Sequence, residues 1–203
     1  MMKKLMFVFM LLAPLFSLAE SKMGKLEIGD KASLTDMKMV CVTGEQVSLE
    51  DVARENGLLV LFSCNTCPFV LRWEDRFPEL KEWADKNDVG MIVLNSNYQK
   101  RNGDDSLEAM KKHASEKGYN FHYVVDTESK IANAFGGQTT PHAFLFDGDM
   151  KLVYKGLIDD NHQSADDVKE AYLKDAISSL AKGQMPEVAE TKPMGCSIKR
   201  KVD

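Results

Sequence analysis

The chain has no excess of positive charge, since its 203 residues include 26 Lys and Arg against 31 Asp and Glu. A nucleic-acid surface would need a basic patch or stripe, so we expect no nucleic-acid partner. Cysteine is also scarce, and four cysteines are too few for a small domain built on disulfides. With 44% hydrophobic and 28% charged residues, the composition is that of a globular domain with a buried core.

Long apolar runs are missing beyond the start of the chain. There, two lysines precede an apolar run, Leu5–Ala13, which Pro14 interrupts, and small residues follow as far as Ala19. A membrane-spanning helix needs about 20 apolar residues. We therefore interpret residues 1–19 as a secretory signal peptide cleaved near Ala19. The remaining 20–203 are predicted to form a single exported domain, periplasmic or extracellular, with no stable membrane anchor.

Hydrophobic patterning predicts alternating strands and helices. Continuous apolar runs at 58–62 and 91–94 are typical of strands buried on both faces. Apolar residues at helical spacing predict a helix from 68 to about 87, kinked at Pro78. We also expect one or two short strands and a short helix before residue 57, a helix at 107–117, a strand at 121–125, a short helix at 129–135, a hairpin of strands 143–146 and 152–154, a last helix at 166–182 and an irregular tail at 183–203.

These elements predict an α/β fold with a central mixed sheet, flanking helices and an N-terminal β-hairpin extension. Ligands of such sheets gather at the carboxyl ends of the parallel strands, and Cys64 follows the first of these strands. If the later hairpin runs antiparallel to them, its first strand starts at the same end. That topology would bring Thr140 and Pro141 beside the cysteine.

The sequence Cys64-Asn-Thr-Cys67 carries the predicted chemistry. A thiol attacks only as the thiolate, which the N-terminus of a helix stabilises. We place Cys64 at the start of the helix as the attacking thiol and Cys67, three residues on, as the resolving thiol. A Cys-x-x-Cys that follows a buried strand and opens a helix indicates redox work. The pair alone would also suit zinc.

Three segments together resemble a bacterial thioredoxin-family group with redoxin (AhpC/TSA-like) domains. They are Phe62–Val70, which contains the Cys-x-x-Cys, Gln138–Pro141, and the Gly-Cys-Ser-Ile-Lys of 195–199. The resemblance covers residues 25–200 and implies a thioredoxin-like fold. It also implies that Pro141 is a cis-proline facing the pair and that the Thr140 backbone pairs with an extended substrate.

The resemblance implies that the partners are protein thiols and disulfides and an unidentified electron donor or acceptor. We expect no cofactor and no resident metal. The sequence differs from thioredoxin at the position of the proton acceptor for Cys67. Thioredoxin keeps a buried aspartate there, and this chain has Leu58. Asp159 and Asp160 are the candidates for that role.

Three other interpretations stay open. The first is a thiol peroxidase, whose nucleophile follows the pattern Pro-x-x-x-Thr-x-x-Cys. Here Gly57 and Leu61 stand at the proline and threonine positions. A leucine side chain cannot form the hydrogen bond by which the threonine orients peroxide. A copper or zinc delivery protein would use both cysteines and His142, although copper-delivery relatives place three residues between the cysteines. A purely structural disulfide in a non-catalytic scaffold is the third.

The other two cysteines allow two hypotheses. Cys41 and Cys196 could form a disulfide that ties the tail to the N-terminal hairpin. Alternatively, Cys196 is a third redox thiol that exchanges with Cys64 or Cys67. The sequence does not decide between them, although the resemblance includes the Cys196 motif and not Cys41.

Overall fold

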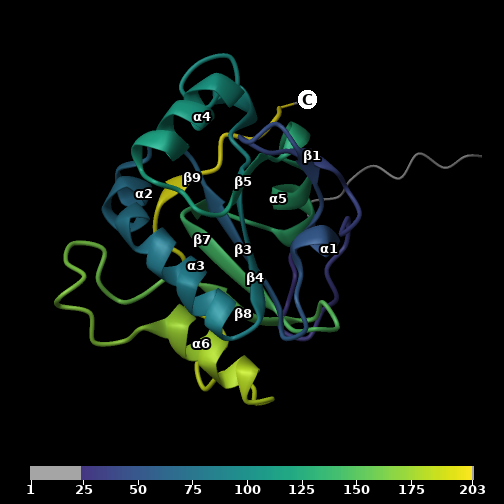
Figure 1. The fold of residues 1–203 in the computed structure, drawn as a ribbon, viewed down its shortest axis with the longest axis vertical. Coiled ribbons are helices and arrows are strands. Elements are labelled where there is room, and N and C mark those ends of the chain that lie inside the picture. Colours follow the sequence, from purple (N-terminus) through teal and green to yellow (C-terminus); the bar gives the residue numbers. More distant parts are fainter. Residues whose placement is uncertain (1–23, 203) are drawn as a thin grey trace, which may run out of the picture.

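The computed structural model describes residues 24–202 (Figure 1). The predicted signal peptide therefore lies outside the described residues. Within the described part of the chain, no helix is both long enough and apolar enough to cross a membrane.

A five-stranded mixed sheet forms the centre of the fold, in the order β5-β4-β3-β7-β8. Its strands are β3 (Gly57–Ser63), β4 (Val89–Asn95), β5 (His122–Val125), β7 (His142–Phe146) and β8 (Leu152–Gly156). β3, β4 and β5 are parallel, whereas β7 and β8 run antiparallel on the other side of β3. Every residue of β3 and β4 is buried, as the two continuous apolar runs predict.

Alternate side chains of β3 enter two separate cores. Leu59 and Leu61 pack on the face that is covered by α2 (Pro68–Trp73), α3 (Phe77–Lys86), α4 (Leu107–Glu116) and α6 (Tyr172–Ala181). Leu58, Val60 and Phe62 pack on the opposite face. That face is covered by α1 (Leu49–Val52), α5 (Lys130–Phe135) and the predicted N-terminal hairpin of β1 (Met39–Val40) and β2 (Gln46–Val47). The predicted α/β fold is therefore confirmed.

Besides the β1–β2 hairpin, two more very short strands pair outside the central sheet. β6 (Thr139–Thr140) pairs antiparallel with β9 (Cys196–Ser197), so the tail that we expected to be irregular contains one strand. Three short 3-10 helices complete the fold: η1 (Glu74–Arg76), η2 (Tyr98–Lys100) and η3 (Thr127–Ser129). In Figure 1 the yellow tail runs past α2 on its way to the C-terminus.

The predicted kinked helix is in fact two helices. α2 ends at Trp73, η1 follows, and α3 begins at Phe77. Pro78 is therefore in the first turn of α3, where a residue without an N–H group breaks no helical hydrogen bond. The interruption precedes the proline, and α3 ends at Lys86, close to the predicted end.

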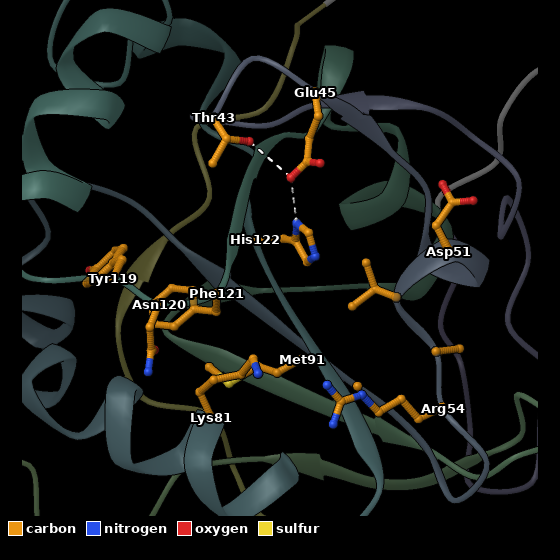
Figure 2. A pocket seen from close by; sticks show the side chains of 13 residues that line it. Thr43, Glu45, Asp51, Arg54, Lys81, Met91, Tyr119, Asn120, Phe121 and His122 are labelled. Atoms are coloured by element: carbon orange, nitrogen blue, oxygen red, sulfur yellow. Dashed lines mark hydrogen bonds and ion pairs between the residues drawn. The ribbon is translucent and has the colours of Figure 1, made fainter.

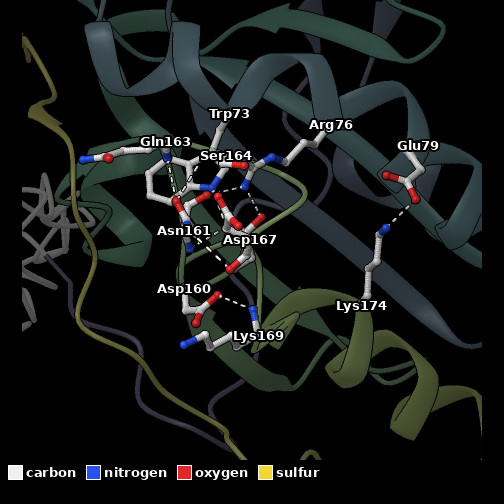
Figure 3. Close-up of polar contacts among 11 residues, drawn as sticks. Trp73, Arg76, Glu79, Asp160, Asn161, Gln163, Ser164, Asp167, Lys169 and Lys174 are labelled. Carbon is white, nitrogen blue, oxygen red and sulfur yellow. Dashed lines mark hydrogen bonds and ion pairs between the residues drawn. The ribbon is translucent and has the colours of Figure 1, made fainter.

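The last helix begins later than predicted, at Tyr172 rather than at 166. Side chains of the preceding loop bind backbone amides instead (Figure 3): Asn161 Oδ1 accepts from the amides of Gln163 and Ser164, and Asp160 Oδ1 accepts from that of Lys169. Such local bonds compete with a helix. The buried face of α6 consists of Leu173, Ala176 and Ile177.

Candidate active site

The two central cysteines lie between the end of β3 and the start of α2. Cys64 directly follows Ser63, the last residue of β3. Helix α2 starts at Pro68, so Cys67 is its N-cap residue. The predicted start of the helix at 68 is confirmed, but Cys64, which we placed at that start, lies one turn before it. Cys67 is consequently the cysteine that lies next to the free amides of the helix N-terminus.

Thr140 contacts both cysteines. Its Oγ1 atom lies 3.3 Å from Cys64 Sγ, and its carbonyl oxygen lies 3.1 Å from Cys67 Sγ. The Thr140–Pro141 peptide bond is cis. The structure thus brings the four residues Cys64, Cys67, Thr140 and Pro141 to one end of the sheet, where the antiparallel run of β7 beside β3 places them.

Cys196 is the third thiol of the site. Its sulfur lies 2.6 Å from Cys67 Sγ, and β9 pairs Cys196 with Thr140. The backbone of Thr140 is therefore paired with the chain's own tail. An extended substrate could pair there only after β9 has left.

Cys41 lies away from this cluster, and all four cysteines are unpaired. Cys41 has no exposed surface and belongs to the core on the hairpin side of the sheet. Its backbone forms an isolated antiparallel β-bridge with Val124 of β5. The disulfide between Cys41 and Cys196 is not made in this structure, where Cys196 contacts Cys67 instead.

Hydrogen bonds within the cluster divide the negative charge unequally. The bond from the Cys64 thiol, supported by the Cys196 thiol and by the Val70 and Cys196 amides, lowers the pKa of Cys67 despite burial. The same bond, together with burial, raises the pKa of Cys64. Burial and the bond to Cys67 raise the pKa of Cys196 to about 11. These directions favour thiolate character at Cys67, whereas the sequence predicts Cys64 as the attacking thiolate.

Neither proposed proton acceptor reaches the cysteines. Asp159 accepts a hydrogen bond from Trp73 Nε1 at 2.9 Å and forms an ion pair with Arg76. Asp160 binds the Lys169 amide in the loop before α6. Both carboxylates organise the 158–171 loop rather than the redox pair.

Asp105, a fully buried carboxylate near the pair, was not predicted from the sequence. It accepts hydrogen bonds from the Asn65 amide at 2.9 Å, from Asn95 Nδ2 at 2.7 Å and from Asn97 Nδ2 at 3.0 Å. Asn65 lies between the two cysteines, so this network fixes the turn that carries them. The charge of Asp105 is also one of the causes that raise the pKa of Cys64. Its position in a long polar loop gave no sequence signal.

His142 does not join the cysteines as a metal ligand. Its Nδ1 accepts a hydrogen bond from the Gln138 amide at 3.1 Å, and its ring packs beside Phe144. Burial, and secondarily Lys155, lower the pKa of His142 to about 3.

One group of three possible metal ligands occurs among residues 24–202, and it is at Cys41, Glu45 and His122, with ligand atoms within 4.8 Å of one another. Glu45 and His122 line a pocket of about 490 Å³, where their side chains point toward each other (Figure 2). Its other lining residues include Arg54 and Lys81. None of the residues that line this pocket is one of the three clustered thiols, so it is separate from the candidate active site.

Comparison with known proteins agrees with this fold. The family model described as Redoxin matches residues 27–172. An uncharacterized conserved protein from Geobacillus kaustophilus is 32% identical, with a TM-score of 0.81 over 88% of this chain and 94% of that chain. Comparison with curated proteins gives no match.

Two more distant solved structures share the fold. A candidate protein disulfide isomerase from Bacteroides thetaiotaomicron is 20% identical, with a TM-score of 0.58 over 77% of this chain and 91% of that chain. Peroxiredoxin Q from Xanthomonas campestris is 18% identical, with a TM-score of 0.55 over 78% of this chain and 96% of that chain.

Proposed function

The chain belongs to the Redoxin family, and from that premise we propose that it is a thiol–disulfide oxidoreductase whose redox pair is Cys64 and Cys67. The observation that carries the proposal is the placement of the two thiols. They are hydrogen-bonded to each other and to Thr140, at the carboxyl end of a buried strand and the N-terminus of a helix. Thiolate character at such a position favours thiol–disulfide exchange.

The shared proton of the pair makes both cysteines available. At rest the Cys64 thiol donates to the Cys67 thiolate. Transfer of that proton creates a thiolate at Cys64, to which the Thr140 hydroxyl can donate across 3.3 Å. The new thiol at Cys67 then donates to the Thr140 carbonyl oxygen, 3.1 Å away. Thr140 therefore stabilises the form in which Cys64 is the nucleophile.

The exchange then takes two steps. The Cys64 thiolate attacks one sulfur of a substrate disulfide, and the other substrate sulfur leaves as a thiolate, which takes the Cys67 proton. The Cys67 thiolate next attacks Cys64 Sγ, which forms the Cys64–Cys67 disulfide and releases the second substrate thiolate. The substrate gains two electrons and the pair loses two. Run in reverse, the same steps oxidise substrate thiols.

The proposed partners are protein thiols and disulfides together with an electron donor or acceptor. We place this exchange outside the cytoplasm on the ground of residues 1–19, whose lysines, apolar run and small residues have the order of a signal peptide. A peroxidase reaction has less support, because the position of the hydroxyl that would orient peroxide is held by Leu61, a fully buried residue of β3.

Trapping with paired variants tests this function. We expect Cys67→Ser/Cys196→Ser to retain one glutathione on Cys64 after incubation with oxidised glutathione, because neither resolving thiol is left. Cys64→Ser/Cys196→Ser should accumulate far less adduct. Intact-protein and peptide mass spectrometry measure both.

The opposite result would reject the assigned roles, namely a stable adduct on Cys67 and none on Cys64. Reduction of a protein disulfide by the wild-type chain, with hydrogen peroxide consumption measured in parallel, separates exchange from peroxidase activity. Peroxide consumption without disulfide exchange would overturn the proposed function.

A further inference from the structure

The tail that carries Cys196 is built into the active site. Gly195 comes so close to β6 that an added Cβ atom would lie 2.2 Å from the Thr140 carbonyl oxygen. Ile198 is only 6% exposed and packs in the core on the hairpin side of the sheet. The Lys199 amide donates to Asn97 Oδ1 at 2.8 Å. These contacts fix the tail on both sides of Cys196.

The three clustered sulfurs differ in their access to solvent. Cys64 and Cys67 are 2% and 4% exposed, whereas Cys196 is only partly buried. Cys67 lies between the other two, because it is hydrogen-bonded to Cys64 and lies 2.6 Å from Cys196 Sγ. Cys67 can therefore form a disulfide with Cys64 or with Cys196. Only the Cys67–Cys196 disulfide includes the sulfur of a partly exposed residue.

We propose that Cys196 exchanges with the oxidised pair, so that the disulfide moves from Cys64–Cys67 to Cys67–Cys196 and reaches the protein surface. This inference rests on the proposed function, since that reaction forms the first disulfide. The Cys196 thiol loses its proton to solvent, and its thiolate attacks Cys67 Sγ. The Cys64–Cys67 bond breaks, the Cys67–Cys196 bond forms, and Cys64 leaves as a thiolate that takes up a proton. No electrons enter or leave the chain in this step.

Oxidation of the pair itself favours the attack. In the reduced chain, the hydrogen bond to Cys67 and the Cys67 charge are among the causes that hold the pKa of Cys196 high, after burial. Both effects end when Cys67 enters a disulfide. The positive charge of Lys199, which acts in the opposite direction, remains. Cys196 thus becomes a better nucleophile once the pair is oxidised.

Disulfide mapping tests the relay in the full chain. A Cys64–Cys67 bond stays within one tryptic peptide, 55–72, whereas a Cys67–Cys196 bond joins this peptide to 183–199. After oxidation with one equivalent of diamide, we expect wild type to contain both forms and Cys64→Ser to contain only the joined peptides. Cys41→Ser is the matched control and should map like wild type, because Cys41 lies outside the cluster.

A pair of glycine variants tests the part played by strand docking while all four cysteines are kept. Gly195→Ala should displace β9, so we expect loss of the joined peptides and retention of the Cys64–Cys67 bond. Gly103→Ala is the control, because the added Cβ atom would meet only the Lys100 carbonyl oxygen at 3.9 Å. Joined peptides in equal amount in both glycine variants would overturn the dependence on docking.

The two proposals fail in different ways. If Cys64→Ser leaves Cys67 and Cys196 reduced or bound only to small thiols, the relay is wrong even where wild type exchanges with substrate disulfides. If the joined peptides form but wild type never reduces or oxidises an external substrate, the proposed function is wrong.

Discussion

Asp105 shows how one buried charge can organise an active site without touching its reactive atoms. Its carboxylate accepts from three amide donors, of Asn65, Asn95 and Asn97, and it has no exposed surface. Removal of such an acceptor leaves buried donors unsatisfied, at a cost of about 1–3 kcal/mol for each group. Because Asn65 lies between the cysteines, loss of the Asp105 acceptor would destabilise the turn that carries both thiols.

We therefore expect Asp105→Ala to lower the free energy of unfolding by about 3 kcal/mol, because three buried donors lose their partner. Urea denaturation of the reduced chain measures the loss. Asp104→Ala is the matched control, since this neighbour is exposed and its backbone carbonyl, which binds Asn65 Nδ2, is kept. Equal stability of the two variants would show that the Asp105 network contributes nothing.

The sequence predicted that Cys64 and Cys67 lie beside Thr140, but it left the place of Cys196 open between two hypotheses. The position of Cys64 after a buried strand, and the run of the hairpin that follows, were enough to bring Thr140 beside it. The start of the helix at Pro68 was predicted, and it makes Cys67 rather than Cys64 the cysteine at the helix N-terminus. Asp105 depends on a loop conformation that no local pattern encodes.

Among the elements, β9 depends most on contacts made far along the chain. It has two residues, and its pairing partner β6 lies more than fifty residues earlier. Ile198, which follows directly, provides the apolar anchor. Two residues of strand cannot hold a chain end alone, so the buried side chain of Ile198 and the hydrogen bonds of Lys199 supply most of the docking.

Ile198→Ala should weaken this docking by about 2 kcal/mol or more, because it removes buried methyl groups. We expect the loss to appear as local opening, with faster alkylation of Cys67 by iodoacetamide in the reduced chain. Val202→Ala, at a residue that is 75% exposed, is the control and should leave the rate unchanged. An unchanged rate in Ile198→Ala would mean that the tail does not restrict access to the pair.

Elements were predictable where their own residues determine them. β3 and β4 follow from continuous apolar runs, and the hairpin of β7 and β8 follows from two apolar segments around Asp-Gly. The 166–171 segment was wrongly assigned to a helix because its spacing is helical, whereas side-chain bonds from Asp160 and Asn161 hold the loop that leads into it. β9 could not be predicted, because its partner is distant.

The whole molecule has its core on both faces of one sheet, so a group buried in the sheet affects global stability. His142 in β7 is such a group. Its pKa is lowered to about 3 by burial and Lys155, against about 6.5 in an unfolded chain. Between these values the unfolded chain binds a proton that the folded chain does not. The free energy of unfolding therefore falls as the pH falls through this window.

For His142 we expect a loss of about 2 kcal/mol between pH 7 and pH 5. Urea denaturation at the two pH values measures it. His142→Gln keeps a side-chain acceptor for the Gln138 amide but has no group that titrates. The free energy of unfolding of this variant should therefore fall by about 2 kcal/mol less than that of wild type between pH 7 and pH 5. Identical pH dependence in wild type and variant would show that His142 is not the group responsible.

The reactivity of the Cys41 thiol reports how often the core on the hairpin side of the sheet opens. Its thiol has no exposed surface and lies on the opposite side of the sheet from α2 and α3, in a core that the redox reaction does not use. A thiol reagent can modify it only when that core opens. In a chain whose other three cysteines are replaced, the modification rate of Cys41 therefore counts opening events one by one, and its dependence on reagent concentration separates the frequency of opening from its duration.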